Sequence, residues 1–320
     1  MHKIIIDTDP GHDDIMAIMT ALAHSDELEL LSFCTVAGNQ TVDKVTNNLL
    51  KVEEYLGLDV PVYQGQAKPM VKEAQPQPQA HGESGMDGPV LSEPLRKAED
   101  ISAVDYYRQI LEKEDEVTIV ALAPLTNLGV LLSSYPELKD RIKEIVLMGG
   151  ALNGGNINKF AEFNIWHDPE AAKIVFDSGV KVVMTPLEVC YKGGILIKET
   201  ERFKKSGKAS KLVDDLFGFY LRYAIDRGWD RTAIFDLIPI LYLLNQGLFT
   251  AEQGRIDIVL DGEDTQGQTV FTKEEGLHTA LIDADREGCM KLFFEAIDRL
   301  DKRYQDVQTD DENVSDRQMS

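Results

Sequence analysis

The sequence predicts an α/β fold: an open, mostly parallel, doubly wound sheet with flanking helices and a helical and lid subregion over the candidate active site. Two observations support this class. Short β-branched runs alternate with longer segments of helical period, and polar segments directly follow the predicted strands. Ligands of such sheets bind beyond the carboxyl ends of the strands, so the segments after each strand are where a site is expected.

The alternation is clearest in the first half of the chain. Strands are expected at residues 4–6, 28–36, 117–121, 144–148 and 181–184, and helices at 15–23, 42–55, 125–132 and 169–177. Between them, residues 64–94 are rich in Pro, Gln and Gly and lack a sustained period. Loops of this length in compact domains are often functional lids. We therefore expect a lid here, and it contains HGESGMDGP at 81–89.

The second half turns helical and aromatic over residues 206–244, which we expect to cap the sheet. Strand patterns at 255–260, 269–271 and 279–282 then precede a helix at 286–300. The end of the chain, DVQTDDENVSDRQMS, is polar and acidic, as disordered tails are. The sequence therefore predicts one domain over residues 1–302 and a disordered acidic tail over 303–320.

Composition limits the partners. The chain has 320 residues, of which 43% are hydrophobic, enough to bury a large core. Asp plus Glu number 55 against 33 Lys plus Arg, and the net charge of −22 argues against nucleic acid or an anionic membrane as the main partner. The sequence has no apolar run of the roughly 20 residues that a membrane span needs and no signal-peptide pattern, so we expect a cytoplasmic protein. Cys34, Cys190 and Cys289 have no paired spacing and are expected to be reduced thiols without a chemical role.

The stretch DTDPGHDD, residues 7–14, places four carboxylates directly after the apolar run at residues 4–6. Carboxylates this close repel one another and have raised pKa values unless a cation offsets their charge. An oxygen-rich set without Cys favours Ca²⁺ or Mg²⁺ over zinc. The alternative is that these aspartates cap the following helix, but capping needs only one of them.

A DxD after a strand is also similar to the start of haloacid-dehalogenase-like phosphohydrolases, which use Mg²⁺. That pattern generally has Thr or Val two residues after the second Asp, where this chain has Gly11. It also leaves Asp13 and Asp14 unexplained, so a phosphohydrolase is the weaker alternative.

Three further polar clusters follow predicted strands: TVAGN at 35–39, ALAPLTN at 121–127, and VLMGGALNGGNINKFAEFN at 146–164. Each alone is explained by a turn or a helix start. Together with the aspartates, at one edge of a sheet, they indicate a site for a polyhydroxylated ligand, because amide and carboxylate side chains bind sugar hydroxyls.

The chain resembles the inosine-uridine preferring nucleoside hydrolases in DTDPGHDD, VAGNQT, HGESGMDGP, IVLMGG and AEFNIWHDPEA, which occur in this order. The resemblance implies cleavage of the N-glycosidic bond of ribonucleosides to ribose and free base on an open α/β sheet with bound Ca²⁺. It also implies a homo-oligomer, a dimer or a tetramer.

The resemblance further implies roles for residues at matching positions. Asp9, Asp14 and Asp236 are expected to ligate Ca²⁺, together with the backbone carbonyl of Leu122, and Asp9 to activate the attacking water. The residues expected to contact ribose are Asp13 and Asn39 at the diol, Asn156, Glu162 and Asn164 at the other hydroxyls, and Met148 against the sugar.

The match departs at Phe235, where many members have a His that assists the leaving base. Phenylalanine donates no proton, so Tyr223 and His81 are the candidates to activate the base, while Phe219, Trp229 and Phe235 are expected to contact it. Helix packing explains Phe219 and Tyr223 equally well. A catalytically weak nucleoside-binding protein is therefore the alternative, and the sequence leaves purine or pyrimidine preference open.

Overall fold

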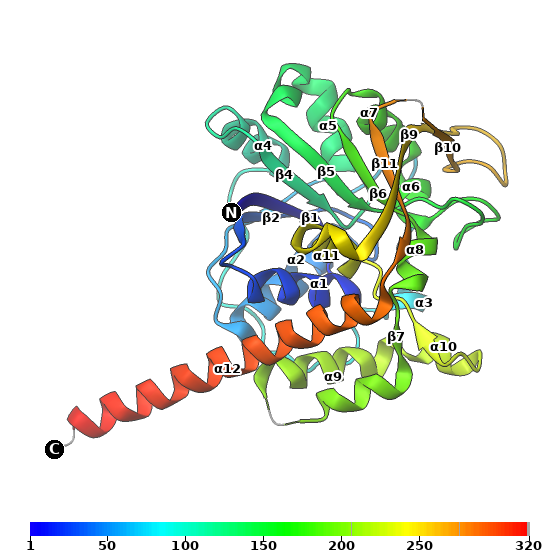
Figure 1. The fold of residues 1–320 in the computed structure, drawn as a ribbon. Coiled ribbons are helices and arrows are strands. Elements are labelled where there is room, and N and C mark those ends of the chain that lie inside the picture. Colours follow the sequence, from blue (N-terminus) through cyan, green and yellow to red (C-terminus); the bar gives the residue numbers. More distant parts are fainter. Residues whose placement is uncertain (206, 275, 319–320) are drawn as a thin grey trace.

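The computed structural model describes residues 1–205, 207–274 and 276–318, with side chains through Gln305. Within them, nine strands form one sheet in the order β10-β9-β11-β6-β5-β4-β1-β2-β3 (Figure 1). The strands are β1 (His2–Thr8), β2 (Leu28–Thr35), β3 (Val62–Gln64), β4 (Val117–Ala121), β5 (Ile142–Met148), β6 (Val182–Thr185), β9 (Phe249–Ile258), β10 (Thr269–Lys273) and β11 (His278–Ala284). In this spatial order, the seven strands β11, β6, β5, β4, β1, β2 and β3 are parallel to their neighbours among these seven. Strand β9 runs antiparallel to both of its neighbours, β10 and β11.

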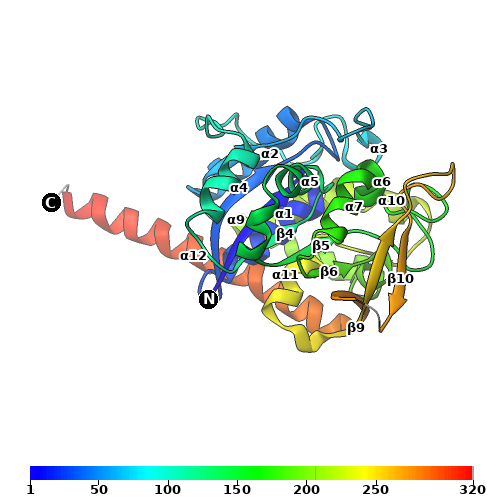
Figure 2. The same ribbon diagram turned by 90° about the horizontal axis from the view of Figure 1, so that it is seen from above.

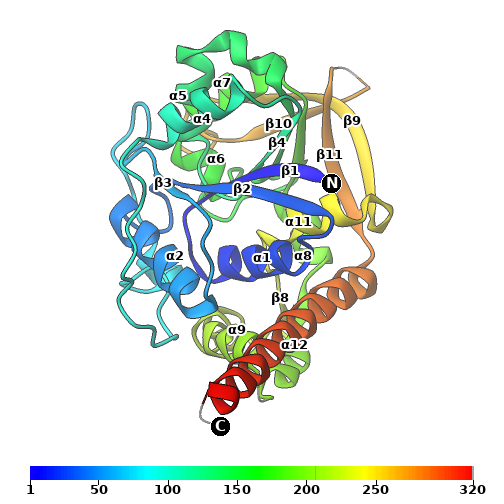
Figure 3. The same cartoon turned by 90° about the vertical axis from the view of Figure 1, so that its left-hand side faces the viewer.

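Helices cover both faces of this sheet, as Figure 3 shows with α4, α5 and α7 on one side and α1, α11 and α12 on the other. The helices are α1 (His12–Ala23), α2 (Val42–Leu56), α3 (Pro78–His81), α4 (Ala103–Leu111), α5 (Thr126–Ser134), α6 (Phe163–His167), α7 (Pro169–Asp177), α8 (Leu187–Lys192), α9 (Lys208–Tyr220), α10 (Arg222–Asp226), α11 (Leu237–Leu244) and α12 (Arg286–Gln318). Three 3-10 turns, η1 (Pro136–Arg141), η2 (Ile197–Phe203) and η3 (Gln246–Leu248), and the short ribbon of β7 (Ile195–Leu196) and β8 (Arg231–Thr232) complete the described elements.

Two hydrophobic cores lie on either side of the sheet. Ile4 and Ile6 of β1 belong to the core under α1, α9, α11 and α12, while Ile5 belongs to the core under α4, α5 and α7. This division follows from the two-residue side-chain period of a strand. Because both faces are covered, the central strands are apolar throughout rather than alternating, and that is the pattern by which the sequence predicts them.

The strand order reverses between β1 and β4. From β1 the sheet continues through β2 and β3 in one direction, and from β4 through β5 and β6 in the other. The connections after β1 and β4 therefore diverge, with α1 on one face of the sheet and α5 on the other. Such a reversal opens a crevice beyond the carboxyl ends of the two strands, where open α/β sheets bind their ligands.

The predicted fold class is confirmed. The predicted strands and long helices are all present, whereas β3 and α4 were not predicted. Residues 64–94 form an irregular segment whose only helix in the described structure is the short α3, in agreement with the predicted lid. The first strand of the last predicted strand region is longer than expected, because β9 begins at Phe249 and not at residue 255, and it pairs antiparallel with β10 and β11.

Helix α12 continues to Gln318, where we expected an irregular tail from residue 303 onward. Figures 1 and 2 show its C-terminal end projecting away from the body, on the side opposite to β9 and β10. The division of the chain at residue 302 stays a prediction. None of the described helices is both long and apolar enough to cross a bilayer.

Ile145 of β5 tests the contribution of the sheet core. It is fully buried between β4 and β6. We expect Ile145→Ala to lower the free energy of unfolding by about 2–5 kcal/mol, because the substitution leaves a cavity. Val90→Ala is the control, since Val90 is 96% exposed, and it should change stability by less than about 0.5 kcal/mol. Equal urea-unfolding midpoints for the two variants would contradict this description of the core.

Candidate active site

Buried carboxylates gather beyond the end of β1. Asp13 and Asp14 lie in the first turn of α1, and Asp236 directly precedes α11. One carboxylate oxygen from each of the three lies within 4.8 Å of the others. Asp9, in the turn between β1 and α1, is also buried and interacts electrostatically with Asp14 and Asp236. The predicted cluster is therefore assembled, and at the reversal of strand order.

Asp14 caps its own helix. Its Oδ2 accepts a hydrogen bond from the backbone N–H of Gly11 at 2.9 Å, and its Oδ1 accepts one from the hydroxyl of Thr8 at 2.6 Å. A carboxylate at the third helical position that binds back to the N-cap backbone is half of a capping box. Capping thus accounts for Asp14, but leaves the burial of Asp9, Asp13 and Asp236 unexplained.

Asn39, in the segment after β2, holds two of these carboxylates. Its backbone N–H donates to Oδ2 of Asp9 at 2.6 Å, and its Nδ2 donates to the Asp9 carbonyl at 3.2 Å and to Oδ2 of Asp14 at 3.3 Å. Gly38 makes this approach possible, because a Cβ atom there would lie 2.0 Å from Oδ2 of Asp9. Both Nδ2 hydrogens are then in use, which leaves the Oδ1 of Asn39 as its acceptor for a ligand.

The protein leaves the charge of this cluster uncompensated. Burial, followed by repulsion among the carboxylates, raises the pKa of Asp9, Asp14 and Asp236, and burial raises the pKa of Asp13 to about 6. Among the described residues no Lys or Arg forms an ion pair with them, and the Oδ1 of Asp13 is buried without a hydrogen-bond partner. Oxygen ligands with excess negative charge and an unpartnered oxygen fit a hard cation such as Ca²⁺ or Mg²⁺.

The carbonyl of Leu122 comes from the end of β4. Leu122 donates its backbone N–H to the carbonyl of Asp7 at 2.8 Å, which continues the β1–β4 pairing and fixes the peptide. Nδ2 of Asn164 donates to the carbonyls of Leu122 and Met148 at 3.0 and 3.1 Å. The structure thus brings Asn164, Met148 and Leu122 together, with the Oδ1 of Asn164 left as its acceptor for a ligand.

Glu162 has a structural role that the sequence analysis missed. It is the N-cap of α6, where Oε1 accepts from the N–H of Asn164 at 2.8 Å and Oε2 accepts from those of Gly150 and Ile165 at 3.0 and 3.2 Å. Burial raises the pKa of Glu162 to about 7. Asn156 is instead exposed, and its Oδ1 accepts from the N–H of Phe163. A contact of either side chain with ribose stays a prediction.

An aromatic cluster links the predicted lid to α1. His81, at the end of α3, is buried with its Nδ1 3.2 Å from Nδ1 of His12, whose Nε2 donates to the carbonyl of Asp87 at 2.8 Å. His12 in turn stacks on Phe219 of α9, with ring centroids 5.2 Å apart. Burial lowers the pKa of His81 to about 4. Two predicted base-side residues, His81 and Phe219, therefore lie together beside the carboxylates.

Two of the remaining base-side residues, Tyr223 and Trp229, lie at the surface, whereas Phe235 is half-buried. Tyr223 and Trp229 are 56% and 45% exposed and pack edge to face, and the guanidinium of Arg227 lies 3.4 Å from the Tyr223 ring centroid. Phe235 precedes Asp236 and packs edge to face against Tyr191. In this structure Tyr223 and Trp229 form a surface pair, so a catalytic role for Tyr223 stays a prediction.

Sequence analysis also missed Tyr220 and His12. The hydroxyl of Tyr220 lies 3.2 Å from Oδ2 of Asp13, and the Tyr220 ring stacks on His12. Both residues are adjacent to positions that the motifs did identify, Phe219 and Asp13, and this adjacency was the available signal. Glu188, a position at which the sequence departs from the family pattern, was given no role. Its carboxylate accepts from the N–H groups of Leu152 and Asn153 and so fixes the loop that carries Asn156.

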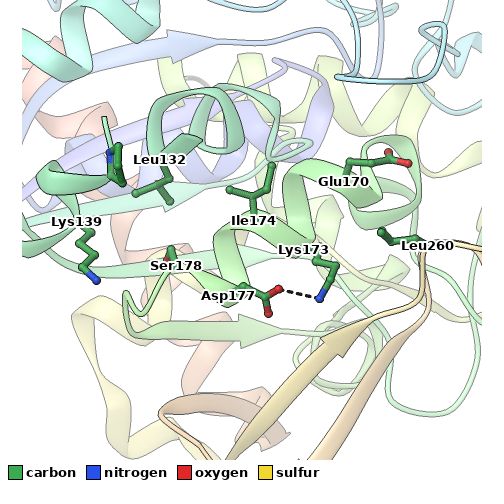
Figure 4. Close-up of a pocket in the computed structure, with 9 residues that line it drawn as sticks. Leu132, Lys139, Glu170, Lys173, Ile174, Asp177, Ser178 and Leu260 are labelled. Carbon is green, nitrogen blue, oxygen red and sulfur yellow. Dashed lines mark hydrogen bonds and ion pairs between the residues drawn. The ribbon is translucent and has the colours of Figure 1, made fainter. Parts of the chain in front are cut away.

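A separate groove of about 480 Å³ runs over α5, η1 and α7 (Figure 4). It is lined by Leu132, Pro136, Lys139, Glu170, Lys173, Ile174, Asp177, Ser178 and Leu260. Lys173 and Asp177 form an ion pair within it. None of the predicted site residues lines this groove, and we assign it no part in the site.

The buried cluster can stabilise positive charge, accept protons and bind hydroxyl groups. Carboxylates in a water-poor environment stabilise a developing cation more strongly than they would in water. The amide of Asn39 contacts Asp9 and Asp14 of the cluster, and the amide of Asn164 contacts the Leu122 carbonyl at the end of the neighbouring strand β4. A sugar with several free hydroxyls, whose ring develops positive charge during the reaction, matches this chemistry. A phosphate matches it less well, because the carboxylates would repel its negative charge.

Comparisons with known proteins agree with this chemistry. Residues 4–300 match the family model of the inosine-uridine preferring nucleoside hydrolases. A pyrimidine-specific ribonucleoside hydrolase, RihA, from Citrobacter koseri is 42% identical over 304 residues, which cover 92% of this chain and 97% of the relative. RihA from a strain of Escherichia coli is also 42% identical, over 90% of this chain and 96% of its own length.

Solved structures give the same result. The purine-preferring ribonucleoside hydrolase from Gardnerella vaginalis superimposes with a TM-score of 0.88 at 31% identity, covering 94% of this chain and 99% of its own. The shared fold therefore extends over nearly the whole chain.

Cation binding to the cluster is testable by thermal unfolding. Ca²⁺ should raise Tm and a chelator should reverse the rise, because a ligand that binds the folded state stabilises it. Protons compete for raised-pKa carboxylates, so the rise should be larger at pH 8 than at pH 5.

Asp14→Asn should abolish the Ca²⁺-dependent rise in Tm. Asp59→Asn is the matched control, since the Asp59 side chain is 93% exposed, and it should keep the rise. A Ca²⁺ effect of equal size in the two variants would place the cation elsewhere.

Proposed function

We propose that this chain, which belongs to the inosine-uridine preferring nucleoside hydrolase family, is a ribonucleoside hydrolase that depends on Ca²⁺ held by its buried carboxylates. The observation that carries the proposal is the uncompensated cluster of Asp9, Asp13, Asp14 and Asp236 at the reversal of strand order. Its proposed products are ribose and the free base.

The proposed ligands are Asp9, Asp14 and Asp236 with the carbonyl of Leu122. When bound, Ca²⁺ would neutralise the cluster and make a nearby water more acidic. The grouping of Asp13, rather than Asp9, with Asp14 and Asp236 within 4.8 Å leaves two assignments for the third carboxylate. We favour Asp9 because it occupies the matching position of the family motif DTDPGHDD. Burial, followed by repulsion from Asp14, raises its pKa, so a cation would stabilise its charged form.

Asp9 is the proposed general base. Burial and the neighbouring Asp14 raise the pKa of Asp9, and a carboxylate with a raised pKa is a stronger base toward water. The N–H of Asn39 holds Oδ2 of Asp9 in place, which leaves Oδ1 to accept the proton. Cleavage of the N-glycosidic bond builds positive charge on the ribosyl ring, and the surrounding carboxylates stabilise that charge.

The ribose hydroxyls are proposed to bind the free acceptors of the site. Asp13 and Asn39 would hold the diol, Asn164 a further hydroxyl through Oδ1, and Met148 would pack against the ring. The other proposed hydroxyl ligands are Asn156 and Glu162. Several anchored hydroxyls would position C1′ for attack.

On the base side, His81 is better placed than Tyr223 or Trp229, because it is buried next to the cluster while they are exposed. With its lowered pKa, His81 would be neutral at pH 7 and would orient the base by a hydrogen bond. We infer that pyrimidine ribonucleosides are the preferred substrates, since the RihA relatives are named pyrimidine-specific. We also propose a cytoplasmic location and a homo-oligomer, a dimer or a tetramer.

Release of free base from a panel of purine and pyrimidine ribonucleosides tests the function. Wild-type protein with Ca²⁺ should release base, and a chelator should stop it. Asp9→Ala should lower kcat by at least about 100-fold, the usual contribution of a general base, while Asp59→Ala should be unchanged. Tight nucleoside binding without base release would favour the weak binding protein, and phosphate release from nucleotides would favour the phosphohydrolase.

Phe235→His tests whether the protein lacks a residue that protonates the departing base. A histidine beside Asp236 would supply a proton to the departing base, so turnover of purine nucleosides should rise about tenfold or more. Phe235→Leu is the control for loss of the ring. Equal turnover by the histidine variant and wild type would mean that another residue, with His81 as the first candidate, already assists the base.

A further inference from the structure

Tyr220, at the C-terminal end of α9, places its hydroxyl between two acceptors. The hydroxyl oxygen lies 3.2 Å from Oδ2 of Asp13 and 3.0 Å from the carbonyl of Ala233. A phenol has one proton, so it donates to one acceptor at a time. An ionised carboxylate is the stronger acceptor. Tyr220 is therefore placed to donate to Oδ2 of Asp13, with the carbonyl of Ala233 as the competing acceptor.

Asp13 has two oxygens with different surroundings. Oδ2 is the oxygen next to Tyr220, whereas Oδ1 is buried and has no hydrogen-bond partner among the described residues. Rotation of a carboxylate about its terminal torsion is soft unless a contact fixes it. Backbone N–H groups of Asp13, Phe235 and Asp14 bind this carboxylate, and the hydroxyl of Tyr220 is the side-chain contact that fixes Oδ2. Oδ1 remains the oxygen that can receive a ligand hydroxyl.

The position of that hydroxyl is itself fixed by packing. The Tyr220 ring stacks on His12, one residue before Asp13 in α1, with centroids 5.7 Å apart. His12 is packed from other directions by Phe219 and by His81 of the lid. Ala233 lies three residues before Asp236. Tyr220 thus contacts both chain segments that deliver carboxylates to the cluster.

We propose that Tyr220 is a positioning residue that holds Asp13 in the orientation that receives the ribose diol, and so sets the preference for ribose over deoxyribose. The inference rests on the proposed function, in which ribose binds at the carboxylate cluster. It assigns to Tyr220 an effect on the sugar and none on the base.

Tyr220→Phe tests this proposal because it removes one oxygen and keeps the stacked ring. The measurement is kcat/KM for uridine, 2′-deoxyuridine and 3′-deoxyuridine. At least one of the two ratios of uridine to deoxynucleoside should fall about fivefold or more, the usual size of one lost hydrogen bond. A merely structural role of Tyr220 would lower the amount of active enzyme equally for all three substrates. Such a loss cancels in the ratio of two kcat/KM values, so a changed ratio reports on sugar preference.

Tyr55→Phe is the matched control. Tyr55 also donates its hydroxyl to a backbone carbonyl, that of Lys208 at 3.0 Å, outside the site. Both ratios should stay within twofold of wild type in this variant. If both also stay within twofold in Tyr220→Phe, the proposal is overturned, whatever the absolute activity.

A binding measurement separates this proposal from the proposed function. With Ca²⁺ present, calorimetric titration with ribose and 2-deoxyribose gives the sugar preference without any turnover. Tyr220→Phe should reduce the preference for ribose even if the wild type releases base slowly or not at all. If the wild type binds ribose no better than 2-deoxyribose, the proposed positioning role of Tyr220 is wrong. The proposed hydrolase function is then decided separately, by the assay of base release.

Discussion

The structure depends on one constraint: four aspartates are buried at one edge of the sheet, and no Lys or Arg in the described part of the chain forms an ion pair with them. Charges placed this way destabilise the folded chain unless they take up protons or a metal ion, and their raised pKa values express that conflict. The same conflict creates the function. A site that must attract positive charge to be stable also stabilises the positive charge that develops when a glycosidic bond breaks.

The rest of the fold serves to keep these carboxylates together. The adjacent pairing of β1 and β4 brings the turn at Asp9 and the carbonyl of Leu122 to the same end of the sheet. Asn39 and Asn164 then use their amide hydrogens on backbone and carboxylate acceptors, so their oxygens remain for a ligand. Asp9, Asn39 and Leu122 follow three adjacent strands, β1, β2 and β4, so the pairing of these strands sets their spacing.

The sequence predicts what is local and periodic. The apolar runs of β1 and β4 and the DTDPGHDD turn are continuous in the chain, so the sheet and most of the carboxylates follow from them. Asp236 lies more than 200 residues from Asp14 and was placed at the site only by resemblance. Tyr220 was missed because its contact with Asp13 depends on how α9 lies against α1, which helical periodicity does not specify. Glu162 was predicted as a ligand residue, but its hydrogen bonds to three backbone N–H groups appear only once α6 is folded.

The most direct measurement of the central claim is calorimetric titration of the wild-type protein with Ca²⁺ at pH 6, in buffers of different ionisation enthalpy. If the carboxylates coexist by sharing a cation, Ca²⁺ binds and displaces protons from groups such as Asp13, whose pKa is about 6. The binding enthalpy then varies with the buffer, with a slope that shows proton release. Absence of Ca²⁺ binding, or binding with a buffer-independent enthalpy, would contradict the account.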